Sequence, residues 1–348
     1  MIVVGVSERP QGPRRGTHLT RRGANLTALE PVANRPIVHH VLDRLRSDSD
    51  AGFVFAGDAD PLLDLRAGLS EYAPGPERVE YVVSDKRRGL AGALMAAAPL
   101  IGEAACLVQP ADGLLDEPIS LLLETVARDR SDLVLLVSER RSQLDLLGHA
   151  YDEARPEAGR DLVVDTALFA PGALRRSADQ GRLAGDDLET VGRKLAASGV
   201  SVHREPVAGW HRYSGYGAEL LNLNRVALDR TVRAVPAPAL LGNQIDGNVR
   251  IDPTALVRSS TVVGPTVIGP GATVTDAYVG PYTSVGAGAR IEGAEIERSI
   301  VSPGASVLNV GARLTSSLVG SGTRVFRDFS LPRAVRLWVG EGDEVALC

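Results

Sequence analysis

The chain has 348 residues, of which 44% are hydrophobic, and its formal net charge is −5. Its length predicts more than one domain, most simply two or three, with an ordinary buried core. Aromatic residues make up only 4%, and acidic residues outnumber basic ones by 43 to 38. This composition argues against a surface for nucleic acids. No apolar run approaches about 18 residues, and Met1–Val6 leads directly into polar residues without a signal-peptide pattern. We therefore expect a cytoplasmic protein without a membrane span.

Short apolar runs alternate with amphipathic stretches through the first two thirds of the chain. Continuous apolar strands that alternate with helices indicate a mostly parallel sheet covered on both faces, hence an α/β domain. The expected strands are 2–6, 53–56, 79–83, 106–109, 133–137, 162–169 and 200–207. The expected helices are 37–45, 90–98, 119–127, 188–197 and 218–228.

The pattern changes after about Gly242, where helical periodicity ends and aliphatic residues recur at about every sixth position. Glycine often follows the aliphatic pair, as in Val263-Gly264 and Val285-Gly286. A hexapeptide repeat of this kind predicts a left-handed parallel β-helix of about 18 residues per coil, whereas a glycine-rich linker would not keep an aliphatic period. We divide the chain into an α/β domain, 1–240, and a β-helix domain, 241–348. The repeating aliphatic residues are Val262, Ile268, Val274, Val279, Val285 and Ile291.

Specific strings resemble the sugar-nucleotide pyrophosphorylases. The segment 29–36, Leu-Glu-Pro-Val-Ala-Asn-Arg-Pro, resembles the L-x-P-V-A-N-K-P segment of glucose-1-phosphate thymidylyltransferases, and 89–93, Gly-Leu-Ala-Gly-Ala, resembles their G-L-A-x-A segment. The segments 263–271 and 276–282 look like the β-helix tail of the long form of that family. The resemblance covers nearly the whole chain and implies a nucleotidyltransferase-like α/β domain that binds a nucleotide and a sugar phosphate.

Members of this family transfer a nucleotidyl group. The sugar-1-phosphate attacks the α-phosphorus of a nucleoside triphosphate, and the protein positions both anions and neutralises charge with a glycine-rich loop, basic side chains and Mg²⁺. The segment after the first strand is longer here than the family loop, although Gly16 and Thr17 fit its end. Pro10 and Pro13 lack the backbone N–H groups that would cradle a phosphate. Two interpretations stay open: an anion site, or a solvated arginine-rich loop. The anion site would use Arg9, Arg14 and Arg15.

Three family positions carry unexpected residues. By the resemblance, His18 stands in the place of the catalytic arginine, and Thr27 lies near the place of a lysine. Only two lysines, Lys86 and Lys194, occur in the chain, so no lysine precedes residue 86. Tyr213 stands at the aspartate of the W-x-D-x-G segment, and a neutral phenol is a poor Mg²⁺ ligand.

One metal carboxylate is retained. Asp112, in Pro-Ala-Asp-Gly after an apolar strand, fits the family's G-D-N segment and is the candidate Mg²⁺ ligand; the alternative is a turn aspartate. Gly89 is a candidate nucleotide contact. Arg155 is a candidate substitute for the lysine that holds the sugar phosphate in the family.

Three functional hypotheses follow. The chain is a non-catalytic relative that binds a nucleotide or sugar phosphate, with a protein partner; or it is a divergent active nucleotidyltransferase with rebuilt arginine contacts, acting on a sugar or cyclitol phosphate. A third hypothesis gives different chemistry to His18, His211 or Tyr213. The expected loss of one carboxylate, one arginine and two lysines favours the first, because each lost cation or donor typically costs roughly 3–4 kcal/mol of barrier. The open ends and flat faces of a β-helix also predict a homo-oligomer.

Overall fold

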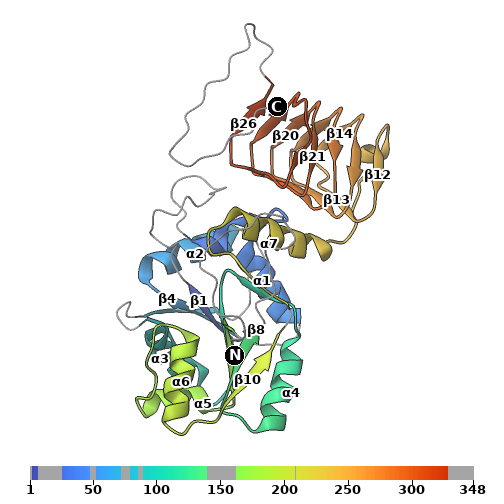
Figure 1. Cartoon of the computed structure of the whole chain (residues 1–348). Helices are drawn as coiled ribbons and strands as arrows, with labels where there is room; N and C mark the ends of the chain where they lie inside the picture. The colour runs from blue at the N-terminus through green and yellow to red at the C-terminus, as the bar shows by residue number, and fades with distance from the viewer. Residues whose placement is uncertain are drawn as a thin grey trace, which may run out of the picture.

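The computed structural model describes residues 2–6, 26–47, 52–71, 79–84, 89–138, 162–207 and 209–327. An α/β domain is followed by a parallel β-helix (Figure 1), which confirms the predicted fold class. The β-helix is consistent with the left-handed form expected from hexapeptide repeats. Within these ranges, every helix is too short or too polar to cross a membrane.

The α/β domain is built on one seven-stranded sheet with the strand order β10-β8-β9-β6-β1-β4-β5. All neighbouring pairs are parallel except those of β9, which runs antiparallel to both β6 and β8. The sheet is therefore mostly parallel, as predicted. Its strands are β1 (Ile2–Val6), β4 (Phe53–Gly57), β5 (Val79–Val83), β6 (Cys106–Pro110), β8 (Leu133–Ser138), β9 (Leu162–Phe169) and β10 (Val202–Pro206).

Helices cover both faces of the sheet, and each face has its own core. One core joins the sheet to α1, α2, α4 and α7; the other joins it to α3, α5 and α6. The short strands β7 (Gly113–Leu115) and β11 (Trp210–Arg212) form a separate antiparallel pair. The helices are α1 (Ile37–Ser47), α2 (Ala59–Glu71), α3 (Gly89–Ile101), α4 (Ile119–Asp129), α5 (Ala173–Asp179), α6 (Leu188–Ala197) and α7 (Gly217–Asp229).

Helices α2 and α5 were not predicted. In α2 the residues Pro61 and Gly68 weaken the helical pattern, yet Pro61 lies in the first turn, where a missing N–H costs no hydrogen bond. Gly68 contacts the side chain of Leu29, and a larger residue would overlap it. Tertiary packing thus explains a helix that sequence propensity does not favour.

The β-helix has five coils, whose strands form three five-stranded parallel sheets. All six of the aliphatic residues singled out in the repeat are buried in its core, at 0–1% exposure. The sheets are β12 (Gln244–Asp246), β15 (Thr261–Val263), β18 (Tyr278–Val279), β21 (Glu295–Glu297) and β24 (Leu314–Thr315); β13 (Val249–Ile251), β16 (Thr266–Ile268), β19 (Thr283–Val285), β22 (Ile300–Val301) and β25 (Leu318–Val319); and β14 (Leu256–Arg258), β17 (Thr273–Thr275), β20 (Arg290–Glu292), β23 (Ser306–Leu308) and β26 (Arg324–Phe326).

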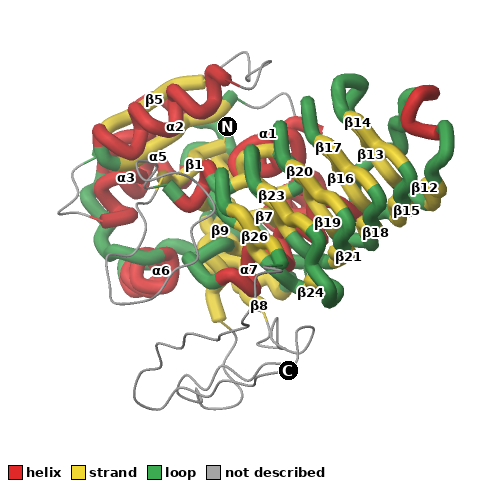
Figure 2. The backbone as a smooth tube through the Cα atoms, turned by 90° about the horizontal axis from the view of Figure 1, so that it is seen from above, coloured by secondary structure: helices red, strands yellow, loops and turns green. Residues whose placement is uncertain are grey.

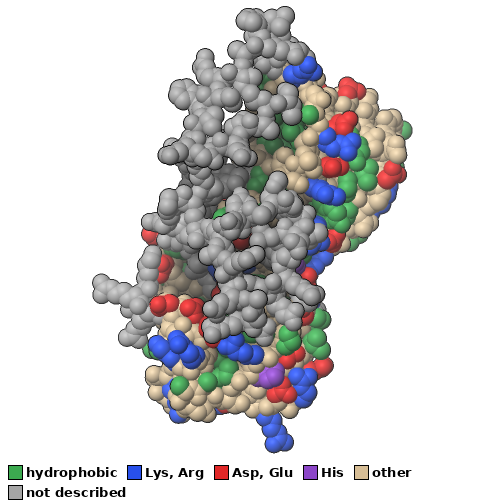
Figure 3. Space-filling view, viewed as in Figure 1, with side chains coloured by type: hydrophobic (Ala, Val, Ile, Leu, Met, Phe, Trp, Pro, Cys, Tyr) green, Lys and Arg blue, Asp and Glu red, His purple; other side chains and the backbone are tan. Residues whose placement is uncertain are grey.

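The coils are shorter than the predicted 18 residues. Gln244 pairs with Thr261, and Thr261 pairs with Tyr278, so each of these coils advances by 17 residues. The difference arises at one corner, between Val274 and Val279, where the backbone turns through Asp276 with φ of 48°. This left-handed residue tightens the corner by one position. On the face seen in Figure 3, basic and acidic side chains are interspersed over the β-helix.

The β13–β25 sheet packs directly on the α/β domain. Ile300 on β22 belongs to the same buried cluster as the core of α1 and α7. Asn224 on α7, almost fully buried, joins three segments: it accepts hydrogen bonds from Ala33 N at 2.8 Å and Ser284 Oγ at 2.6 Å, and donates to Tyr282 O at 3.1 Å.

The hairpin of β2 (Pro31–Val32) and β3 (Arg35–Pro36) adds a second connection to the β-helix. Its two turn residues, Ala33 and Asn34, both have positive φ, as a tight two-residue turn requires. Asn34 Nδ2 donates to Val285 O at 2.6 Å. Figure 2 shows the ladders of the β-helix lying alongside the α/β domain. The segment 29–36, which carried the family resemblance, thus helps to join the two parts.

Candidate functional site

The carboxyl edge of the parallel strands carries the candidate site. The chain runs from β1 to β4 and β5 on one side of the sheet, and then returns to β6 on the other side of β1. The adjacent ends of β1 and β6 are therefore a topological switch point, where open α/β sheets bind ligands. Gly5 pairs with Pro110 there, and Asp112 follows two residues later.

A cluster of four side chains surrounds the Asp112 carboxylate. The Thr27 hydroxyl donates a short hydrogen bond to Asp112 Oδ2, and Arg212 Nε donates to Asp112 Oδ1 at 3.0 Å. The Arg212 Nη1 atom also contacts Asp165 Oδ2 in a second ion pair. The Asp112 side chain is 4% exposed, that of Arg212 31% and that of Asp165 46%. The cluster thus has a buried end at Asp112 and a solvent-facing end at Asp165.

The pairing of β7 with β11 holds Arg212 in this position. Gly113 pairs with Arg212, and Tyr213 N donates to Asp112 O at 3.1 Å. Trp210 lies against Gly113, where the methyl group of an alanine would overlap the indole ring. Gln109, buried at the end of β6, donates to Gly113 O at 2.6 Å. These contacts fix the backbone on both sides of the Asp112–Arg212 ion pair.

Electrostatics keep the cluster charged. Burial by itself would lower the pKa of Arg212, but the carboxylates of Asp112 and Asp165 raise it above its usual value. The guanidinium therefore stays protonated at any physiological pH and supplies one positive charge between two negative ones. Both oxygens of Asp112 already accept hydrogen bonds, from Thr27 and from Arg212.

This arrangement does not fit a Mg²⁺ ion at Asp112. Mg²⁺ needs oxygen ligands in a nearly octahedral shell, and a guanidinium beside the carboxylate repels a second cation. Arg212 would have to leave Asp112 before a metal ion could bind there. As it stands, the cluster can receive hydrogen bonds at Asp165 and attract an anion to Arg212.

The sequence placed Tyr213 at the second carboxylate position, but Tyr213 is fully buried in the hydrophobic core with α7 and β7. The side chain opposite Asp112 is that of Arg212, one residue earlier. Counting W-x-D from Trp210 leads to Arg212, so the tryptophan spacing held the signal that the glycine at 215 obscured. Sequence analysis also missed Asp165, because it lies inside an apolar strand and matches no motif.

The other predicted residues are placed as follows. Gly89 begins α3 with φ of 52°, and its Cα lies so close to Asp186 that any side chain would overlap the backbone. Ala91 N donates to Gly185 O at 3.0 Å, so the segments 89–93 and 185–190 are in contact. The remaining predicted residues lie outside the described ranges: Arg9, Arg14, Arg15, Gly16, Thr17, His18 and Arg155.

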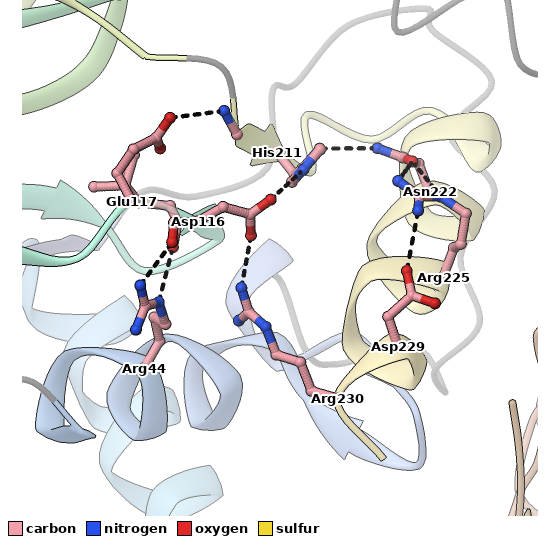
Figure 4. A network of polar contacts seen from close by, with 10 residues as sticks. Arg44, Asp116, Glu117, His211, Asn222, Arg225, Asp229 and Arg230 are labelled. Carbon is pink, nitrogen blue, oxygen red and sulfur yellow. Dashed lines mark hydrogen bonds and ion pairs between the residues drawn. The ribbon is translucent and has the colours of Figure 1, made fainter. Parts of the chain in front are cut away.

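A second polar network lies on the opposite side of β11 (Figure 4). His211 lies 3.3 Å from Asp116 Oδ2 and 3.1 Å from Asn222 Nδ2. Arg230 donates to Asp116 Oδ1 at 2.6 Å. Burial favours a higher pKa for Asp116, but hydrogen bonding to His211 and the charges of His211, Arg230 and Arg44 outweigh it and lower the pKa. The network ties β7 and β11 to α1 and α7, and so supports the strand that carries Arg212.

Comparison with known proteins gives consistent relatives. The chain is 29% identical over 334 residues to a glucose-1-phosphate thymidylyltransferase of Streptomyces griseus, which covers 90% of this chain and 91% of the relative. This chain is a relative of the glucose-1-phosphate thymidylyltransferases. A thymidylyltransferase of Streptomyces antibioticus is 24% identical over 337 residues, covering 92% of this chain and 93% of its own. No family model matches the chain.

A third relative widens the group beyond thymidylyltransferases. The low-salt glycan biosynthesis nucleotidyltransferase Agl11 of Haloferax volcanii is 26% identical over 340 residues, with 92% of this chain and 93% of the relative covered. All three similarities span both the α/β domain and the β-helix. The chain therefore shares its architecture with sugar-1-phosphate nucleotidyltransferases along nearly all of its described length.

Proposed function

We propose that this protein is a cytoplasmic relative of the sugar-1-phosphate nucleotidyltransferases that binds a nucleotide or a sugar phosphate and has lost ordinary thymidylyl transfer. The observation that carries the proposal is the ion pair between Arg212 and Asp112, with the second contact from Arg212 to Asp165. A fixed guanidinium occupies the side of Asp112 that a metal ion would need. Binding of a phosphate then depends on Arg212 rather than on Mg²⁺.

The physical reason is the charge that develops during nucleotidyl transfer. A divalent ion bridging the phosphates neutralises this charge directly, whereas Arg212 already shares its charge with two carboxylates. Loss of one such preorganised cation costs roughly 3–4 kcal/mol of barrier, or 10²–10³ in rate. Thr27, which donates to Asp112 instead of providing a lysine charge, supports the same conclusion.

A second candidate is a divergent active enzyme. Arg212 and Asp165 are partly exposed, so an incoming phosphate can compete with Asp165 for the guanidinium while Asp112 keeps it oriented. In this alternative, Arg9, Arg14, Arg15 or Arg155 supplies the other positive charges and Mg²⁺ arrives with the triphosphate. The reaction is then NTP plus a sugar- or cyclitol-1-phosphate, giving the nucleotide sugar and pyrophosphate.

Pyrophosphate release from a panel of nucleoside triphosphates and sugar phosphates distinguishes the two. We expect no measurable transfer from dTTP to glucose-1-phosphate, together with nucleotide binding that EDTA does not abolish. The Arg212→Asp variant places a second carboxylate beside Asp112 and should make nucleotide binding depend on Mg²⁺. The matched control is Arg193→Asp, which makes the same charge change at an exposed position of α6. Robust turnover by the unmodified protein would favour the divergent enzyme.

The proposal extends to assembly and domain division. We propose a homo-oligomer, associated through the β-helix domain, 241–348, and a separate nucleotidyltransferase-like domain, 1–240. A protein partner would use the same domain. Light scattering should give a mass well above the 36.7 kDa of one chain at micromolar concentration; a monomeric mass would refute the oligomer.

A further inference from the structure

A cluster of a histidine and two carboxylates lies at the far edge of the sheet from β5. His203 and Glu205 are on β10, the edge strand, and Asp129 is the last residue of α4. Residues two apart on a strand point to the same face, so His203 and Glu205 both face the end of α4. The cluster therefore joins two elements through three side chains that ligate metals.

This cluster is separate from the Asp112 site. Strands β6 and β8 are parallel, because each is antiparallel to β9. Asp112 follows the carboxyl end of β6, whereas Asp129 precedes β8 and His203 pairs with Val134 near the start of β8. The two groups thus lie at opposite ends of the sheet, and neither takes part in the other's hydrogen bonds.

The distances fit metal coordination. His203 Nε2 lies 3.1 Å from Glu205 Oε2 and 3.4 Å from Asp129 Oδ2, and the three ligand atoms all lie within 4.8 Å of one another. Tetrahedral ligands at about 2.0–2.1 Å from Zn²⁺ are roughly 3.4 Å apart. Two separations already match, and a small rotation of the Glu205 side chain would close the third.

Charge and exposure also favour a cation. The side chains of His203, Asp129 and Glu205 are 36%, 25% and 26% exposed, so a hydrated ion can reach them without a change of fold. Arg128 is their cationic neighbour; it lies 2.9 Å from Asp129 and 3.7 Å from Glu205, and its side chain is 63% exposed. The hydrogen bond from Arg128 keeps the pKa of Asp129 below its usual value, so this carboxylate is ionised at neutral pH.

We propose that Asp129, His203 and Glu205 bind one divalent transition-metal ion, Zn²⁺ or a similar ion, that fastens the end of α4 to edge strand β10. One imidazole and two carboxylates match the ligand preference of such ions better than that of Mg²⁺ or Ca²⁺, which favour oxygen alone. Three protein ligands leave a further position for water. The exposed Arg128 swings away when the ion binds.

Titration of the whole chain with Co²⁺ and Zn²⁺ tests the proposal, using the visible absorption of Co²⁺ and calorimetry. We expect one ion per chain, and at least tenfold weaker binding in His203→Gln and in Glu205→Gln. Arg128→Ala should bind severalfold more tightly, because the competing charge is removed. The control is His211→Gln, which changes a histidine that faces a single carboxylate, Asp116.

Circular dichroism establishes that each variant is folded, as expected for partly exposed side chains. Zn²⁺ should also raise the melting temperature of the wild type, and not that of His203→Gln, because an ion that binds only the folded state stabilises it. Absence of binding up to millimolar metal, or equal affinity in wild type and His203→Gln, would overturn the site. Tighter binding by Arg128→Ala excludes a purely structural ion pair.

Discussion

The β-helix and the crevice around Asp112 are stabilised in different ways. In the β-helix each aliphatic residue meets equivalent residues in the coils before and after it, so Val274 pairs with Val257 and with Ile291. At Asp112 the contacts come from residues 85, 100 and 47 positions apart in the chain, through Thr27–Asp112, Asp112–Arg212 and Arg212–Asp165. A periodic pattern builds the first region, and a few non-repeating contacts build the second.

The difference shows where function can change without loss of the fold. A substitution in the β-helix core is felt by the stacked neighbours, because packing in interiors is tight. A substitution at Arg212 exchanges one partly exposed ion pair and leaves the sheet intact. Sites of this second kind can diverge while the architecture persists, as the 24–29% identity to the nucleotidyltransferases illustrates.

The largest effect is expected in the β-helix core. Ile291→Ala removes a fully buried side chain from the middle coil and should lower the free energy of unfolding by about 4 kcal/mol. Urea unfolding of this variant beside Glu292→Ala, whose ion pair with Arg290 is exposed, measures the contrast. A loss below about 1 kcal/mol would show that the coils are loosely packed and would weaken the comparison.

A pH effect is expected in the α/β domain. Burial lowers the pKa of His40 on α1 to about 4, although its contact with Val32 O, at 2.9 Å, opposes this. The unfolded chain takes up a proton near pH 6.5, so stability is complete above that pH and falls as pH decreases toward 4, by about 3 kcal/mol at most. His40→Gln should flatten this slope in urea unfolding between pH 4 and 7. An unchanged slope would assign the pH dependence to other groups.

The junction of the two regions can be weakened selectively. Asn224→Ala leaves Ala33 N and the Ser284 hydroxyl without their buried partner and should cost about 2 kcal/mol. Asn34→Ala removes one part-buried bond, to Val285 O, and should cost about 1 kcal/mol. Calorimetry should show the unfolding of the two regions becoming less cooperative in Asn224→Ala. Equal losses in both variants would contradict the central role of Asn224.

The smallest effect is expected on the surface of the β-helix. Arg313 lies 4.7 Å from the centre of the Tyr278 ring and 2.9 Å from Glu295, with its side chain 47% exposed. Exposed pairs of this type contribute little, so Arg313→Ala should change the free energy of unfolding by less than about 1 kcal/mol. High salt should reduce this difference further. A loss comparable with that of Ile291→Ala would mean that surface ladders, rather than the aliphatic core, hold the coils together.

Much of the fold follows from local pattern. The aliphatic period predicted the β-helix because every coil repeats the same short-range rule, and its buried residues are those of the period. The strands and five of the helices of the α/β domain were predicted with ends within about four residues. Helix α2 was missed because its packing against Leu29 and β4 compensates for an unfavourable composition.

The sequence by itself determined the order of the elements, the change at Gly242 to a β-helix, and Asp112 as the carboxylate at a strand end. Only the tertiary structure decided that Arg212 and Thr27 are the partners of Asp112, and that Asp165 completes the cluster. The same holds for Asp129, which meets His203 only because α4 ends beside the edge strand β10. The physical reason is range: periodic burial is encoded within a few residues, whereas an ion pair depends on the register of strands that are distant in the chain.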